Sequence, residues 1–312
     1  MIRQILRRTF MMSAVAALAL TAAACGEKSG GSAGAPQELV FSVQPAEGAD
    51  LANLHWTPLI EDLSRKTGLK VTLRLSPNYT TLVQAMAHNQ TQLAWFSALP
   101  AVEAINRADA EVFARTVDLE GRTTYTSVIL ARKGKGLTIE KLMACDKTLT
   151  FGIGDAKSTS GTLAPKTFLF NPKGVTPENC FKQVRSANHQ ANMLAVANGL
   201  VDAATNNSTG LNFYRTGTPE AQAAFAKTEV IWESPTLPES AMLYRKDLDP
   251  AVKEKLRQFF LTYGTATGPE GDKERANLQL LKYSKFEAAD DAYLAPIIEM
   301  VKADAAAEKK AQ

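Results

Sequence analysis

The sequence of 312 residues is poor in the residues that build metal sites, with only three cysteines and three histidines. None of them stands in a Cys-x-x-Cys or His-x-x-x-His arrangement, so we expect no metal and no cofactor. The glycines in mid-chain also miss the standard phosphate-binding patterns. No Gly-Lys-Ser/Thr follows Gly154 at the required spacing, and Ala156 and Lys157 interrupt the dinucleotide fingerprint.

The chain also lacks a large excess of charge of one sign. Its formal net charge is +3, and Arg3, Arg7 and Arg8 account for all of it, because residues 1–24 contain no acid. The remaining chain is formally neutral, which argues against nucleic acid as a partner. The hydrophobic content of 45% is ordinary for a globular protein.

The N-terminal residues are typical of an export signal rather than of a fold. Three arginines precede an apolar run, Met11–Ala24, that is too short for a comfortable membrane span. Arg7-Arg8-Thr9-Phe10-Met11 resembles a twin-arginine motif, and Leu20–Cys25 resembles a bacterial lipobox, although Ala22 departs from the preferred Leu. We therefore expect a signal peptide over 1–24 and a lipid on Cys25; simple cleavage near Ala24 is the alternative.

Residues 25–37 are rich in Gly, Ser and Ala and predict a flexible tether after the lipidated cysteine. We therefore expect the protein to be located in the periplasm, anchored to a membrane through its lipid and not spanning it. We expect the protein to be a monomer.

The stretch Thr148–Gly161 predicts an anion-binding turn. β-branched and aromatic residues give a strand up to Ile153, and glycines mark the turn. Ser158, Thr159 and Ser160 then precede a helical pattern, in which Pro165 is tolerable only in the first turn. Free backbone N–H groups and hydroxyls at a helix start attract anions. An ordinary N-cap, which needs one hydroxyl, is the alternative.

Alternating strand and helix patterns predict an α/β fold with open, mostly parallel sheets and, from the length, two domains. Strands are expected at 38–43, 70–75, 92–96, 111–116, 124–132, 149–154, 181–186, 201–205, 229–232 and 241–244. Helices are expected around 56–63 and over 79–86, 100–107, 188–198, 251–263, 273–282 and 290–306, so the end of the chain reads as helical.

Cys145 and Cys180 remain as a possible disulfide in an exported protein. Each precedes a predicted strand of the second half, 149–154 and 181–186. If these parallel strands are neighbours, their starts lie close together, and we expect the two cysteines to pair.

The chain resembles periplasmic solute-binding proteins of ABC transporters, in the group that binds phosphonate, phosphite or phosphate. The residues that carry the resemblance are Phe151–Asp155, Ser158–Gly161, Ser186–Asn192 and Ala195–Asn207. It implies a two-lobed fold of type II, in which each lobe is an open sheet flanked by helices and two strands cross between the lobes. The crossings map to Thr124–Arg132 and Ala241–Tyr244, lobe one to 38–130 with the helical part 245–312, and lobe two to 131–244.

The candidate ligand-binding residues combine the turn with residues that the resemblance adds. Ser158, Thr159, Ser160 and His189 come first, since His189 follows Asn188 at a strand-to-helix junction of the same sheet edge. The full set is Tyr79, Tyr125, Ser158, Thr159, Ser160 and His189, with Phe96, Ser97, Asn207, Glu239 and Ser240 as weaker candidates and Trp95 beside them. His55 and His88 are interpreted as surface residues, and Thr159→Ala is expected to weaken binding without changing the melting temperature.

The resemblance implies a binding protein that captures a phosphorus oxyanion between closing lobes and delivers it to an ABC transporter permease. A binding protein that serves a sensor is the alternative. An enzyme acting on phosphate esters is disfavoured, because no Gly-x-Ser-x-Gly elbow surrounds Ser160 and no carboxylate can be assigned to His189 from the sequence.

Group members that bind an aminoalkyl phosphonate carry acidic residues where this chain has neutral Thr209 and Ser240. A buried ammonium needs a paired charge. The sequence therefore predicts a compact ligand without an amine, unless Glu239 or Glu233 supplies the missing charge.

Overall fold

The computed structural model describes residues 38–311, so the predicted signal peptide, Cys25 and the tether lie outside the described residues. The strands are β1 (Glu38–Val43), β2 (Lys70–Leu75), β3 (Leu93–Phe96), β4 (Ala110–Asp118), β5 (Thr124–Tyr125), β6 (Ser127–Arg132), β7 (Thr150–Ile153), β8 (Gln183–Ser186), β9 (Ala203–Asn207), β10 (Thr228–Glu233), β11 (Leu237–Pro238), β12 (Ala241–Arg245) and β13 (Tyr283–Ala288). The α-helices are α1 (Ala49–Thr67), α2 (Tyr79–Ala87), α3 (Ala98–Arg107), α4 (Ile139–Leu142), α5 (Pro177–Cys180), α6 (His189–Ala197), α7 (Ser208–Arg215), α8 (Pro219–Phe225), α9 (Pro250–Thr262), α10 (Pro269–Leu280) and α11 (Ala295–Ala311).

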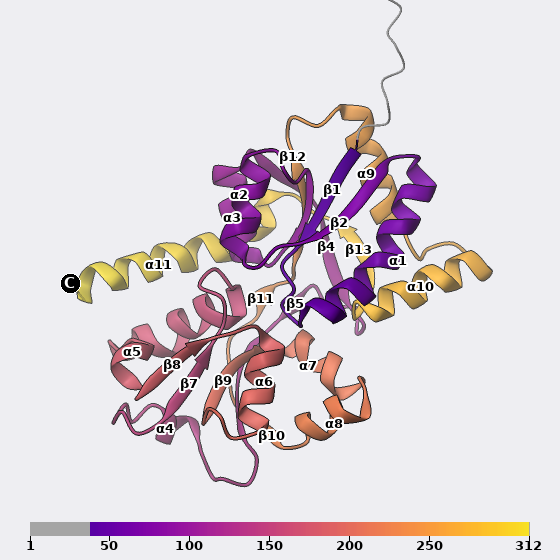
Figure 1. Ribbon diagram of the computed structural model, residues 1–312. Helices are drawn as coiled ribbons and strands as arrows, with labels where there is room; N and C mark the ends of the chain where they lie inside the picture. Colours follow the sequence, from indigo (N-terminus) through magenta and orange to yellow (C-terminus); the bar gives the residue numbers. More distant parts are fainter. Residues whose placement is uncertain (1–37, 312) are drawn as a thin grey trace, which may run out of the picture. The chain divides into compact units, whose positions relative to one another are not determined.

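The first lobe is built on a six-stranded sheet with the order β13-β4-β12-β3-β1-β2 (Figure 1). Only β1 pairs in parallel, with β2 and β3; the remaining pairs are antiparallel. The sheet is therefore mixed, and the prediction of mostly parallel sheets was wrong. The prediction of a purely helical C-terminal part was also wrong, because β13 adds an edge strand there after α10.

The second lobe is built on a five-stranded sheet with the order β10-β6-β9-β7-β8. Its parallel pairs are β7 with β8 and β7 with β9, and β6 runs antiparallel to both β9 and β10. The parallel strands β7, β8 and β9 end at one edge of this sheet, which faces the other lobe. The residues that follow β7 and β9 at this edge form part of the site described below.

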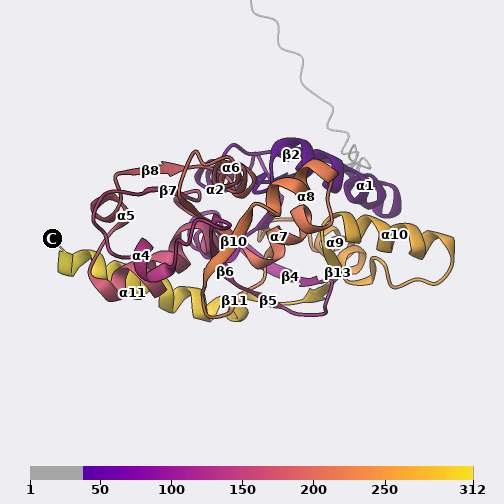
Figure 2. The same ribbon diagram turned by 90° about the horizontal axis from the view of Figure 1, so that it is seen from below.

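Two very short strands connect the lobes. β5 and β11 pair antiparallel and form a separate two-stranded ribbon (Figure 2). The chain passes from the first lobe to the second through β5, which lies between β4 and β6 in sequence. It returns through β11, which lies between β10 and β12. The crossings expected at Thr124–Arg132 and Ala241–Tyr244 are therefore corrected. β6 belongs to the second sheet and β12 to the middle of the first, so the lobe boundaries fall near Thr124 and Pro238 rather than at 130 and 244.

Both faces of each sheet are covered by apolar side chains that alternate along the strands, as period-2 geometry requires. In β12, Met242 and Tyr244 face the cluster under α1 and α9, whereas Leu243 faces the cluster with α2, α3 and α11. In β6, Ile129 and Leu130 likewise enter different clusters. The helices therefore lie on both faces and leave the edge between the lobes for polar residues.

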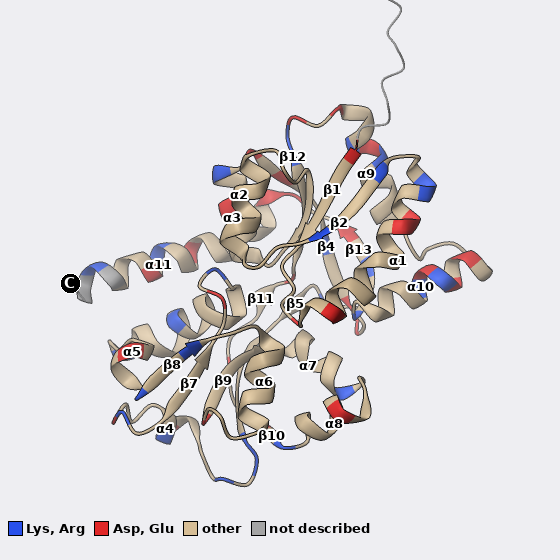
Figure 3. Cartoon of the chain, viewed as in Figure 1, with Lys and Arg blue, Asp and Glu red and all other residues tan. Residues whose placement is uncertain are grey.

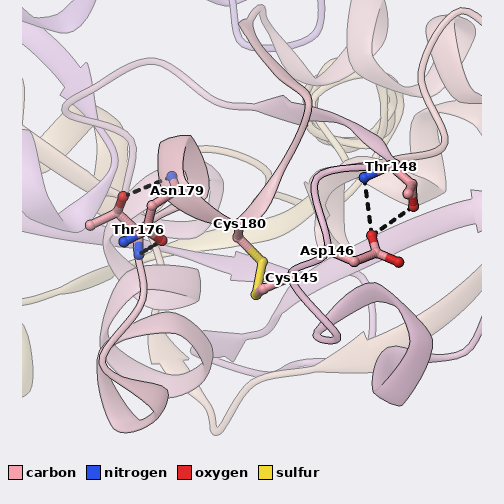
Figure 4. Close-up of a disulfide and its surroundings, with 6 residues drawn as sticks. All are labelled: Cys145, Asp146, Thr148, Thr176, Asn179 and Cys180. Carbon is pink, nitrogen blue, oxygen red and sulfur yellow. Dashed lines mark hydrogen bonds between the residues drawn. A yellow bond between two sulfur atoms is a disulfide. The ribbon is translucent and has the colours of Figure 1, made fainter.

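A disulfide joins Cys145 to Cys180, with the two Cα atoms 4.0 Å apart (Figure 4). Strands β7 and β8 are parallel neighbours in register from Thr150 and Gln183, which brings the two preceding cysteines together as the sequence predicted. The bond therefore ties the loop before β7 to the end of α5.

Charges of both signs are interspersed over helices and loops in the view of Figure 3, without a continuous basic stripe. No helix in the described part of the chain has the length and apolar character to cross a membrane. Within residues 38–311, no group of three or more His, Cys, Asp or Glu side chains is placed to hold a metal ion.

Candidate functional site

A cavity of about 90 Å³ lies between the two lobes and receives side chains from both. The first lobe contributes the loop after β1, helix α1, the start of α2 and the end of β3, and the second lobe contributes the turn after β7, the start of α6 and helix α7. The ribbon of β5 and β11 adds Tyr125 and, just after it, Glu239 and Ser240.

The turn after β7 is shaped by two glycines and a proline. Gly154 and Gly161 pack so closely that a Cβ atom on either would come within 2.8 Å of the other's Cα. Pro165 lies in the second turn of the helical segment, later than the sequence predicted, and cannot donate to the carbonyl of Gly161. That carbonyl accepts instead from the Gly154 N–H (3.0 Å) and the Thr205 hydroxyl (2.9 Å). Because Pro165 has no N–H, the Gly161 carbonyl is available to these two donors, which fix the turn. The helix accommodates the proline by forming wide π-type turns over Thr159–Leu163 and Lys166–Phe170.

The three consecutive hydroxyls of this turn have three different roles. Ser158 caps the segment by accepting from the Gly161 N–H at 3.0 Å, and Ser160 lies 3.4 Å from Nε2 of His189. Both line the cavity. Thr159 does not: its hydroxyl oxygen accepts from the Leu99 N–H (2.8 Å) at the start of α3 and lies 3.2 Å from the Ser97 hydroxyl. It therefore bridges the lobes beside the cavity.

His189 is the first residue of α6, and its ring faces the cavity. Its backbone N–H donates to the carbonyl of Ala46 in the other lobe at 3.0 Å, and the Asn206 amide donates to its carbonyl, also at 3.0 Å. Burial lowers the pKa of His189 to about 4, so the ring is neutral near pH 7. A neutral ring can donate one hydrogen bond to an oxyanion while its other nitrogen accepts.

Tyr79 and Tyr125 approach the same turn from the first lobe and from the connecting ribbon. Both hydroxyls are buried, and burial raises the pKa of each well above its usual value. Tyr79 interacts with Ser97, and Tyr125 interacts with Ser160. Two protonated phenols therefore stand beside the serine hydroxyls as potential donors to a bound anion.

Most of the weaker sequence candidates also line the cavity, namely Ser97, Asn207, Glu239 and Ser240. Phe96 does not line it. This side chain is fully buried in the core of the first lobe, because alternation along β3 turns it away from the neighbouring Trp95.

Gln44 and Glu47 carry no binding signal in the sequence, and the prediction that His55 is a surface residue was wrong. All three line the cavity. The His55 ring stacks on Phe213 across the lobes, with ring centres 5.4 Å apart, and burial lowers its pKa to about 4. The loop after β1 and the first turns of α1 contain no local binding motif. Gln44, Glu47 and His55 belong to the site because α7 of the second lobe packs against these segments. His88 is exposed, as predicted.

Three residues that line this cavity each carry a buried polar atom without a hydrogen-bond partner in the described part of the protein: Oε1 of Gln44, Nε1 of Trp95 and Nδ1 of His189. Buried polar groups in folded proteins nearly always have partners. Three such residues in the wall of one cavity mark it as the candidate site.

Two lobes of mixed sheet, joined by a two-stranded crossing ribbon around a buried polar cavity, define the class of two-lobed solute-binding proteins. Within that class, the chain matches the profile of a family described as "ABC transporter, phosphonate, periplasmic substrate-binding protein" over residues 41–294. It therefore belongs to this family of periplasmic components of ABC transporters.

Individual relatives agree with the family profile. The chain is 37% identical over 260 residues to the phosphonates-binding periplasmic protein of Escherichia coli, covering 83% of this chain and 74% of that protein. A binding component of an ABC phosphonate transporter from Pseudomonas aeruginosa superposes with a TM-score of 0.83 at 33% identity, covering 89% of this chain and 90% of that one. A protein from Prochlorococcus marinus, solved with methylphosphonate, shares the fold with a TM-score of 0.75 at 22% identity, over 86% of this chain and 98% of that one.

Proposed function

We propose that this protein captures a phosphorus oxyanion, such as a phosphonate, phosphite or phosphate, in the cavity and delivers it to an ABC transporter permease. The observation that carries the proposal is the presence of several neutral hydrogen-bond donors in the wall of one cavity. Ser158, Ser160, Tyr79, Tyr125 and His189 reach it from both lobes and from the connecting ribbon. Their donors can bind a tetrahedral anion only when the lobes are together, which couples ligand capture to closure.

The geometry of Ser160 and His189 favours binding over catalysis. Their side chains approach to 3.4 Å, as in a nucleophile–base pair. A hydrolytic triad, however, needs an acceptor that orients the second ring nitrogen, and Nδ1 of His189 has no partner among the described residues. The pair therefore acts as a donor set for an anion, and we propose that the protein is not an enzyme.

We further propose that the ligand is compact and lacks an amine. Thr209 and Ser240 both line the cavity. They are the neutral residues at the two positions where binders of aminoalkyl phosphonates are expected to carry acids that pair with the ligand's ammonium group. Glu233 is exposed and does not line the cavity; its carboxylate accepts from the Thr126 hydroxyl at 2.7 Å. Glu239 does line the cavity, but its carboxylate already accepts from Thr209, Thr116 and the Ser240 N–H.

The first prediction concerns the ligand itself. Calorimetric titration of the mature protein at fixed salt with phosphite, phosphate, methylphosphonate and 2-aminoethylphosphonate should show binding, with an amine-free compound tightest. No binding of any of the four would overturn the proposed function. Tightest binding of the aminoethyl compound, lost in Glu239→Gln, would overturn only the amine-free ligand.

The location is proposed from the sequence together with the periplasmic family. We propose that the mature protein is a monomer anchored to the membrane by a lipid on Cys25, which lies outside the described residues. Mass spectrometry of the mature N-terminus should show a diacylglycerol-bearing Cys25, and an unmodified N-terminus would contradict this.

A further inference from the structure

The wall of the cavity has a deeply buried polar part and a less buried apolar part. The hydrogen-bond donors of the proposed anion site are all buried, namely Tyr79, Tyr125, Ser158, Ser160 and His189. Leu51, His55 and Phe213 line the same cavity, but these three side chains are only half-buried. The wall therefore includes two aromatic rings that lie nearer to the protein surface than the donors do.

Two helices, one from each lobe, carry these half-buried residues. On α7, Thr209 and Phe213 are four residues apart, so they share one helical face, and both line the cavity. On α1, Leu51 and His55 have the same spacing and also line it. The two faces meet at the rings of His55 and Phe213, whose centres are 5.4 Å apart and whose planes differ by 13°.

The Phe213 ring has a second partner in the first lobe. Lys282 lies between α10 and β13, and its Nζ is 5.5 Å from the centre of the Phe213 ring. The same ammonium group donates to the Thr216 hydroxyl at 3.0 Å, just after α7. Ring stacking and a cation over an aromatic face are both favourable contacts. Phe213 belongs to the second lobe, yet two contacts of its ring are with the first.

The residues around Phe213 in the sequence hold α7 against the first lobe. The Tyr214 hydroxyl donates to the carboxyl group of Glu47 in the loop after β1. Gly210 permits this approach, because a Cβ atom there would lie only 2.6 Å from Oε1 of Glu47. Contacts on either side of Phe213 in the sequence therefore set the position of its ring when the lobes are together.

We propose that His55 and Phe213 form an aromatic gate, one ring from each lobe, which closes over the substituent of a bound phosphonate and limits its length. This inference rests on the proposed function and adds which residues set the size of the ligand. The phosphoryl oxygens lie at the buried donors, and the substituent points toward the gate. The cavity measures about 90 Å³, whereas pockets for drug-sized ligands have roughly 300–1,000 Å³. A methyl or ethyl group thus fits beneath the closed gate, and a butyl group does not.

The gate should discriminate by the length of the substituent, because a chain that is too long must displace the packed rings or keep the lobes apart. One methylene group more or less in an apolar pocket changes affinity about 10- to 200-fold. We therefore expect butylphosphonate to bind the wild type at least about a hundredfold more weakly than methylphosphonate. Phe213→Ala removes the ring that obstructs the longer chain, so this ratio should fall by at least about tenfold.

The test measures the affinities of phosphate, methylphosphonate, ethylphosphonate and butylphosphonate by calorimetry on the mature wild-type protein, Phe213→Ala and His55→Ala. Phe225→Ala is the matched control: Phe225 is also a half-buried ring of the second lobe with a cation over it, Arg215 at 5.8 Å, but it does not line the cavity. Thermal unfolding of each empty variant identifies misfolded protein. Phe213→Leu, which keeps an apolar side chain of intermediate size, replaces Phe213→Ala if that variant misfolds.

The ratio of the methylphosphonate and butylphosphonate affinities separates a gate from a contact that only stabilises closure. Loss of such a contact weakens every ligand by the same factor and leaves the ratio unchanged, whereas loss of the gate lowers the ratio. The proposal expects a lower ratio in Phe213→Ala and His55→Ala but not in Phe225→Ala. Equal affinity of the wild type for the two phosphonates, or an unchanged ratio in either folded gate variant, would overturn it. Failure of every phosphorus compound to bind the wild type would instead overturn the proposed function.

Discussion

Ser160 and Thr159 are neighbours in the sequence, but their hydroxyl groups have partners in different parts of the molecule. The Ser160 hydroxyl lines the cavity beside His189, and the Thr159 hydroxyl holds the Leu99 N–H at the first turn of α3. A buried N–H that loses its partner costs about 1–3 kcal/mol. At the residue scale, one hydroxyl is thus available to the ligand and the other stabilises the closed protein.

Ser160→Ala should weaken oxyanion affinity about 10- to 150-fold, which corresponds to the loss of roughly 1.5–3 kcal/mol for a hydrogen bond to a charged group. It should leave the melting temperature of the empty protein unchanged. Thr159→Ala should instead lower both the affinity and the free energy of unfolding, because the Leu99 N–H loses its acceptor; the sequence alone predicted an effect on binding only. Calorimetry and thermal unfolding separate the two, and unchanged affinity of Ser160→Ala would remove the turn from the site.

At the scale of elements, strands β7 and β8 and the segment from Ser158 to Lys173 form one connected unit around the turn. Gly154 and Gly161 permit close backbone contact, the Ser160 carbonyl accepts from the Ser127 hydroxyl at 2.6 Å, and the disulfide closes the opposite end of β7 and β8. The unit is therefore fixed at both ends.

Removal of the disulfide should destabilise this element without changing the site. The Cys145→Ala/Cys180→Ala variant loses a link across 35 residues of sequence, worth roughly 3–4 kcal/mol in the chain-entropy account. We expect a lower melting temperature with ligand affinity within about twofold of the wild type. Two reactive thiols in the denatured, exported wild-type protein, counted apart from Cys25, would contradict the presence of the bond.

At the scale of the whole molecule, polar contacts between the lobes surround the cavity. Lys157 pairs with Glu103 of α3 at 2.6 Å, and Asp304 of α11 accepts from both Lys166 (2.9 Å) and Asn171 (2.8 Å) of the second lobe. Helix α11, which follows the first lobe's last strand, reaches the segment that carries the turn (Figure 1). These contacts favour the closed form without touching the ligand.

Asp304→Ala should therefore weaken ligand binding although Asp304 does not line the cavity. The loss of two contacts worth about 0.5–1.5 kcal/mol lowers affinity roughly 2- to 10-fold through the equilibrium between open and closed forms. Glu299→Ala is the control on the same helix, since Glu299 pairs with Lys302 one turn further on and with no other side chain among the described residues. Stopped-flow dissociation should be faster for Asp304→Ala alone; equal rates in wild type and Asp304→Ala would exclude a role for α11 in closure.

Local patterns predicted much of this protein. Propensity and capping act between residues close in sequence. They were enough to predict the strand, the small-residue turn and the hydroxyls of Thr148–Gly161, and the helix start at Asn188. The pairing of Cys145 with Cys180 followed from the two adjacent strands that these cysteines precede. By contrast, β13 was not predicted. The crossings were also misplaced: the apolar run Ala241–Tyr244 has the pattern of an ordinary buried strand, whereas the actual crossing strand Leu237–Pro238 has no strand pattern.

The sequence by itself determined the α/β elements, the disulfide partners and the hydroxyl-rich turn, because each follows from neighbouring residues or from the start of adjacent strands. Only the tertiary structure decided which hydroxyl faces the cavity and which bridges the lobes. It alone brought Gln44, Glu47 and His55 into the wall, since their neighbours lie on α6 and α7, more than a hundred residues away in sequence. The charge of the site is a property of this long-range assembly, and no local pattern encodes it.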